Sequence, residues 1–78
     1  MAYTHRQIVE SLIRSYRGQI ATLQNQLAPL EAGTMRIGES REGGPWVDIT
    51  GKQIQLLKSG IQQYEMAIED LEGSINAN

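Results

Sequence analysis

The chain has 78 residues and a mass of 8.7 kDa, which allows one small domain. Its 40% apolar content is too high for a disordered chain, and it has no apolar run long enough for a transmembrane helix or a signal peptide, so we expect a cytoplasmic protein with no membrane contact. Cysteine is absent and there is one histidine, so we expect no disulfide, zinc site or cofactor, and the net charge of −2 makes nucleic acid an unlikely partner.

The first predicted element is a helix over residues 5–28. Thr4 and Gln7 have the spacing of a capping box at its start. Pro29 lacks an N–H and disfavours helical geometry at Ala28, so we expect the helix to end there, with Gly33 as a stop signal beyond it. Alternating spacings of four and three residues place an apolar coiled-coil stripe on this helix, made of Val9, Ile13, Tyr16, Ile20, Leu23, Leu27 and Leu30.

The connector over residues 29–49 is too long for a tight helical turn. Met35 and Ile37 alternate with polar residues, as do Val47 and Ile49, and a glycine-rich segment lies between the two pairs. This pattern predicts a short β-hairpin over residues 34–49, with an irregular loop as the alternative. Because a lone hairpin is marginal in water, its apolar residues should pack on the helix ends or on another subunit.

The second predicted helix covers residues 51–73. Thr50 and Gln53 form another candidate capping box, and Gly73 should end the helix, leaving residues 74–78 as a frayed tail. Its apolar stripe has the same coiled-coil spacing and consists of Ile54, Leu57, Ile61, Tyr64, Ile68, Leu71 and Ile75.

The two stripes are equally long, which predicts an antiparallel two-helix coiled-coil hairpin of mainly all-α class. Positions whose numbers sum to 84 should then face each other. In that register Tyr16 faces Ile68 and Ile20 faces Tyr64, so we expect each tyrosine to meet an isoleucine rather than the other tyrosine.

A two-helix hairpin covers each stripe from one side only, and this chain has neither metal nor disulfide to add stability. Covering a few further aliphatic side chains in a second copy would outweigh the marginal stability of one hairpin. We therefore predict a homodimer that forms a four-helix bundle, with higher rings as the alternative. The additional apolar residues beside the stripes are Ile8, Leu12, Leu56, Met66 and Ala67.

Catalytic chemistry is not indicated by the sequence. His5 lies at the start of the first helix with no carboxylate at a spacing that suggests a triad, so we expect no enzyme. The acidic segment Glu65–Glu72 is interpreted as an ordinary solvated helix face rather than a cation site, and Arg14 and Arg17 should lie beside it in the antiparallel hairpin.

Trp46 is the one tryptophan, and Arg36 and Arg41 lie in the same connector. An indole near guanidinium groups is typical of protein contact surfaces, although Trp46 could instead close the apolar end of the bundle. The favoured hypothesis is a non-enzymatic, homo-oligomeric protein-interaction module, such as a small inhibitor, adaptor or assembly factor. A product of a phage or mobile element would suit this size and acidity.

The alternative hypothesis is an oligomeric small-ligand binder that grips an anionic group such as a nucleotide phosphate. The residues nominated for that role are Arg14, Arg17, Arg36 and Arg41 for the anion and Tyr3 and Trp46 for stacking.

Overall fold

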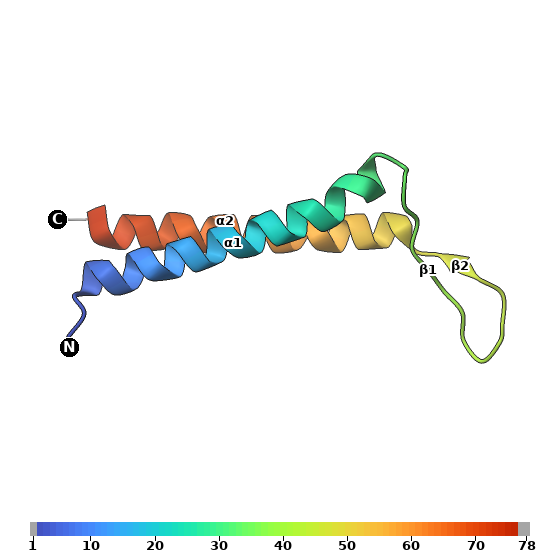
Figure 1. Cartoon of the computed structure of the whole chain (residues 1–78), viewed down its shortest axis with the longest axis horizontal. Helices are drawn as coiled ribbons and strands as arrows, with labels where there is room; N and C mark the ends of the chain where they lie inside the picture. Colours follow the sequence, from blue (N-terminus) through green and yellow to red (C-terminus); the bar gives the residue numbers. More distant parts are fainter. Residues whose placement is uncertain (1, 77–78) are drawn as a thin grey trace.

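The computed structural model describes residues 2–76, which form two long helices joined by a small β-hairpin (Figure 1). The elements are α1 (His5–Glu31), β1 (Gly38–Glu39), β2 (Val47–Asp48) and α2 (Thr50–Asn76). The helices run antiparallel and form a rod, and the β-hairpin projects from the end opposite the two termini, so that the whole molecule measures 56 × 25 × 16 Å. The predicted helical hairpin with a small β-hairpin is therefore confirmed for a single chain.

The capping box at the start of α1 is present. Thr4 Oγ1 accepts the Gln7 backbone N–H at 3.1 Å, and the Thr4 backbone N–H donates to Gln7 Oε1 at 2.9 Å. Two backbone N–H groups that no helical carbonyl can reach are thus satisfied.

The end of α1 differs from the prediction, because the helix passes through Pro29 and ends at Glu31 rather than at Ala28. The Pro29 carbonyl accepts the Thr34 N–H at 3.0 Å, the Leu30 carbonyl accepts the Gly33 N–H at 3.3 Å, and Gly33 has a φ of +78°. This is the Schellman termination that a left-handed glycine permits. Proline forfeits one backbone hydrogen bond, and the terminating bonds stabilise the last turn by satisfying the Pro29 and Leu30 carbonyls.

α2 departs from the prediction at both ends. Thr50 is its first residue rather than its cap, and the second capping box does not form because the Thr50 hydroxyl hydrogen-bonds to Ile37 in the connector. The helix also continues past Gly73 to Asn76, so the first residues of the expected tail are helical, and residues 77–78 lie outside the described part of the chain. Ile75 packs on the apolar core, which offsets the cost of an exposed helical glycine.

The apolar stripes meet along the rod in the predicted antiparallel sense. Val9, Ile13 and Ile68 are buried together near the termini, and Leu27, Leu30 and Ile61 are buried along the half nearer the β-hairpin. Gly60 lies so close to Leu23 that an added Cβ would approach its side chain to 3.3 Å, so the missing side chain allows α1 to come near.

The expected pairing of the tyrosines is wrong. The rings of Tyr16 and Tyr64 lie with their centroids 5.4 Å apart at an interplanar angle of 48°. We call the line along which the two apolar stripes meet the seam, and each pair of facing residues in it a layer. The two tyrosines belong to adjacent layers, and a phenol ring is long enough to reach from one layer to the next. The tilted arrangement is one that aromatic quadrupoles favour.

The β-hairpin is shorter than predicted, since its strands pair only Gly38 with Asp48 and Glu39 with Val47. Its tip is closed by a hydrogen bond from the Gly44 N–H to the Arg41 carbonyl at 2.8 Å. Consecutive positive φ angles at Glu42 and Gly43 turn the chain there and take it out of the ladder.

Candidate functional site

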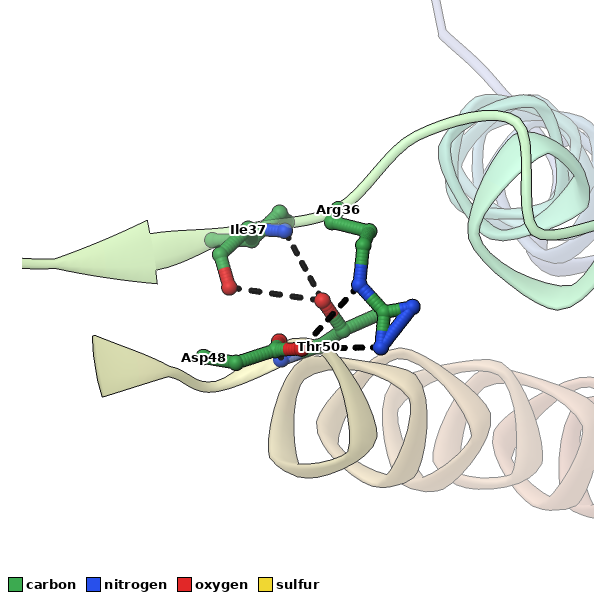
Figure 2. A network of polar contacts seen from close by, with 4 residues as sticks. All are labelled: Arg36, Ile37, Asp48 and Thr50. Carbon is green, nitrogen blue, oxygen red and sulfur yellow. Dashed lines mark hydrogen bonds and ion pairs between the residues drawn. The ribbon is translucent and has the colours of Figure 1, made fainter. Parts of the chain in front are cut away.

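The β-hairpin is fixed to the start of α2 by a polar network that we call the junction, consisting of Arg36, Ile37, Asp48 and Thr50 (Figure 2). The Thr50 hydroxyl accepts the Ile37 N–H at 2.9 Å and donates to the Ile37 carbonyl at 3.3 Å. Asp48 Oδ1 accepts the Thr50 N–H at 2.9 Å, and Asp48 Oδ2 receives Arg36 Nε at 3.1 Å and Arg36 Nη2 at 3.0 Å. A single buried threonine and one carboxylate therefore join both strands to the helix.

The carboxyl group of Asp48 is held in its charged form. The Thr50 side chain lowers the pKa of Asp48 most, the Thr50 backbone N–H contributes next, and the Arg36 guanidinium adds to both. A negative charge just ahead of α2 also interacts favourably with the positive end of the helix dipole. The junction therefore depends on an ionised Asp48.

Trp46 lies against β1 rather than against the helices. A Cβ atom at Gly38 would overlap the Trp46 indole ring, so the ring covers the bare backbone of that glycine. Trp46 nonetheless remains 57% exposed, so in the single chain it does not close the apolar end of the two-helix rod. Met35 and Val47 are also largely exposed at this end of the rod, although Met35 lines a groove with Leu30 and Leu57. Ile37 and Ile49 are half-buried, so the expected packing on the helix ends is present in part, and packing on another subunit stays a prediction.

The two connector arginines differ in their surroundings. Arg36 is engaged by Asp48 within the junction, so its role is to position the hairpin. Arg41 lies near the hairpin tip beside Glu39, Pro45 and Val47, and it forms no ion pair with any residue in the range 2–76. Of the two, Arg41 is the one available for a ligand or partner.

The remaining nominated residues belong to the other half of the rod. Arg17 pairs with Glu72 across the two helices at 3.6 Å, which confirms that α1 lies beside the acidic segment of α2. Arg14 lines the same groove as Arg17, and Tyr3 precedes α1 with 70% of its surface exposed. A single chain therefore does not bring Arg14, Arg17 and Tyr3 together with Arg36, Arg41 and Trp46.

The long sides of the rod differ sharply in charge. The seam occupies the a and d positions of each helix, so the g and c positions lie on one side and the e and b positions on the other. We call the first side the charge-poor flank. On α1 it consists of His5, Ile8, Leu12, Ser15, Gln19, Thr22, Gln26 and Pro29. On α2 it consists of Gln53, Leu56, Gly60, Gln63, Ala67, Asp70 and Ser74, so that Asp70 alone carries a charge when His5 is neutral.

The opposite side, which we call the charged flank, carries the ion pairs between the helices. Arg17 pairs with Glu72, and Lys58 pairs with Glu31 at 3.0 Å. Further charges on this flank are Glu10, Arg14, Glu65 and Glu69. Met66, which was expected beside the seam, lies on the outer face of α2 and is exposed.

Comparisons of the chain with protein-family models, with curated proteins and with solved structures give no match. Neither helix, within residues 2–76, is long and apolar enough to cross a membrane. In the same range no three His, Cys, Asp or Glu side chains are grouped so that they could hold a metal ion.

The junction is not predicted by the sequence patterns considered above. An aspartate two residues before a helix start, in Asp48-Ile49-Thr50, is nonetheless a signal for a side chain that accepts a helix N–H. The apolar residues of the charge-poor flank are predicted beside the stripes, and extending the heptad assignment from the a and d positions to the g and c positions shows that few charges accompany them.

Proposed function

We propose that this chain is a non-enzymatic, homo-oligomeric protein-interaction module whose β-hairpin contacts a partner protein. In this role it acts as a small inhibitor, adaptor or assembly factor, by occupying a surface of the partner. The contact residues are Trp46, Val47 and Arg41, with Arg36 holding the hairpin in place.

The observation that supports this proposal is the exposed Trp46 on a hairpin whose backbone is fixed by the junction. Tryptophan and arginine are the residues that most often dominate binding energy at protein interfaces. A segment that is already ordered loses little conformational entropy on binding, so its contacts contribute more fully to affinity. The hairpin also projects beyond the helices, which gives a partner free access to it (Figure 1).

The anionic-ligand hypothesis has less support. Arg36 and Arg17 already have carboxylate partners, and the aromatic residues Tyr3 and Trp46 lie toward opposite ends of the rod. A ligand clamp would have to be completed by residues from a second copy.

The proposal is tested with the full chain as immobilised bait in a lysate of its own source cells. Wild-type protein should retain one partner protein, and Trp46→Ala and Arg41→Ala should each lose it, because they remove the two exposed groups best suited to bind. Tyr3→Ala is the matched control, since it removes an exposed aromatic ring from the other end of the rod and should leave retention unchanged. Circular dichroism establishes that each variant keeps its helices.

Equal retention by Trp46→Ala and wild type would contradict the proposal. Thermal stabilisation by nucleotides that disappears in Arg41→Ala would instead favour the anionic-ligand hypothesis.

A further inference from the structure

The rod exposes far more surface than a compact chain of its mass. Its accessible surface is 6046 Å², whereas an 8.7 kDa globular monomer exposes about 4,700 Å². Its radius of gyration of 17.8 Å likewise exceeds the 11–12 Å or so expected for a compact chain of this length. The excess of about 1,300 Å² is more than the roughly 800 Å² that each partner buries in a standard stable interface.

The charge-poor flank is the side of the rod that can be covered at low cost. Burying an unpaired charge is expensive, and the centres of protein interfaces are depleted of charged residues. The charged flank would have to desolvate its arginines, lysine and glutamates, whereas the charge-poor flank holds only Asp70. It also carries three exposed large apolar side chains, those of Ile8, Leu12 and Leu56.

Both ends of this flank expose apolar residues. Near the termini, Ile8 and Leu12 lie one helical turn apart on α1 as an exposed apolar pair, which we call the ridge, and on their outer side they border a hollow of about 600 Å³ that Tyr3 and Ser11 also line. Near the β-hairpin, a groove of about 360 Å³ opens between the helices, bordered by Gln26 and Gln53. Its apolar lining consists of Pro29, Leu30, Met35, Ile37 and Leu57. Ridge and groove therefore lie at opposite ends of one side of the molecule.

This placement makes the flank self-complementary. The ridge is centred near position 10 of α1 and the groove near position 28, so a two-fold axis that crosses the rod midway between them passes close to Gln19. Rotation about that axis brings the ridge of each copy onto the groove of the other, which is the reciprocal contact that two-fold symmetry requires.

We propose that two copies of this chain pair antiparallel through the charge-poor flank, with Ile8 and Leu12 of each copy seated in the groove of the other and the two Gln19 residues meeting at the axis. This assignment rests on the proposed homo-oligomeric function and names its interface. The resulting dimer is a four-helix bundle with one β-hairpin at each end. Such a dimer binds in a bivalent manner, so two partner sites of suitable spacing would be held with increased avidity.

Cysteine placement tests the axis directly, because the natural chain has none. A residue near a two-fold axis lies close to its own copy, so oxidised Gln19→Cys should form a disulfide-linked dimer. Gln24→Cys is the matched control: it is an exposed glutamine of the same helix, but it lies on the charged flank and should remain unlinked under the same oxidation.

A charge placed in the interface gives a second readout. Leu12→Glu should raise the dimer dissociation constant at least about tenfold, because the new carboxylate would be buried against the apolar groove. Gln24→Glu adds the same charge to the opposite flank and should leave the dissociation constant unchanged. Light scattering reports the mass of each variant, and circular dichroism checks that its helices remain.

These experiments distinguish failure of the assigned dimer interface from failure of the proposed self-association. A wild-type chain that is monomeric at tens of micromolar would overturn both this inference and the self-association in the proposed function. A dimer that cross-links through Gln24→Cys and not Gln19→Cys, or that keeps its mass with Leu12→Glu, would overturn the assignment of the face alone. Retention of the partner protein is measured separately and does not depend on either result.

Discussion

The helical rod and the β-hairpin are stabilised by different interactions. The rod is held by apolar burial along a seam of two antiparallel helices, and among residues 2–76 the ion pairs between the helices lie on one flank. In the β-hairpin Met35, Trp46 and Val47 are exposed, and the segment is held by hydrogen bonds and one ion pair at the junction. Burial is non-directional and tolerates changes of partner, whereas the junction depends on the geometry of a few polar atoms.

This difference indicates that the two regions can be perturbed one at a time. Loss of a core side chain should unfold both, because the hairpin has no apolar core of its own and is marginal without the helix to which it is joined. Loss of a junction contact should loosen the hairpin and leave the helices paired. The junction therefore determines how Trp46 is positioned, whereas the apolar seam determines whether the chain folds.

The largest effect is expected from Ile68→Ala, which empties part of the core cluster around Val9 and Ile13. Ile68 is only 7% exposed, and truncation of a buried isoleucine to alanine costs about 2–5 kcal/mol of unfolding free energy. Urea unfolding followed by circular dichroism at one fixed protein concentration should show this loss, with Trp46 fluorescence changing in the same transition.

Met66→Ala is the matched control for that substitution. Its side chain lies on the outer face of α2, so the unfolding free energy should change by no more than about 0.5 kcal/mol. If Ile68→Ala and Met66→Ala proved equally mild, the seam would not be the source of stability.

The next effect is expected from Thr50→Val, which keeps the shape of the side chain and removes its hydroxyl. The N–H of Ile37 then loses its acceptor in a partly buried place, at a cost of about 1–3 kcal/mol to the local stability of the hairpin. Amide hydrogen exchange should accelerate at Ile37 while the amides of the helix interiors keep their protection.

Thr22→Val controls for the loss of a hydroxyl as such. The Thr22 hydroxyl donates to the Gly18 carbonyl on the exposed surface of α1, so its removal should leave exchange at Ile37 unaltered. Accelerated exchange throughout both helices in Thr50→Val would show that hairpin and rod form one cooperative unit.

The helical part of this molecule could be predicted from sequence because its signal repeats. Residues such as Ile13 and Ile61 recur at a fixed period, so many positions support one antiparallel seam, and the capping box at Thr4 adds a local start signal. Pro29 and Gly73 do not end their helices as their local propensity predicts. The Schellman bonds outweigh that propensity after Pro29, and packing of the last turn outweighs it at Gly73.

The candidate site was less predictable. Trp46 and Arg41 could be nominated by residue type, but the junction joins Ile37 to Thr50 and Arg36 to Asp48, which are contacts between residues 12 or 13 positions apart. Such pairings depend on the register of a two-residue ladder, and no periodicity in the sequence encodes that register. For the same reason the contact of Trp46 with Gly38 became visible only in the folded chain.

The smallest effect is expected from acid, and it should be confined to the hairpin. The pKa of Asp48 is lower in the folded chain than its ordinary value of 3.8, so the charged carboxylate stabilises the folded hairpin. This stabilisation is fully present above pH 3.8 and is lost as the pH falls through the pKa of the folded chain. Between pH 7 and 5 the amide resonances of Ile37 and Thr50 should therefore stay constant, and below about pH 4 they should shift together as the carboxylate is protonated and releases Arg36 and the Thr50 N–H. In Asp48→Asn these resonances should be displaced already at neutral pH and should no longer titrate. A titration of the same shape in Asp48→Asn would mean that another acid controls the junction, and the difference between the polar hairpin and the apolar rod would then have to be explained without Asp48.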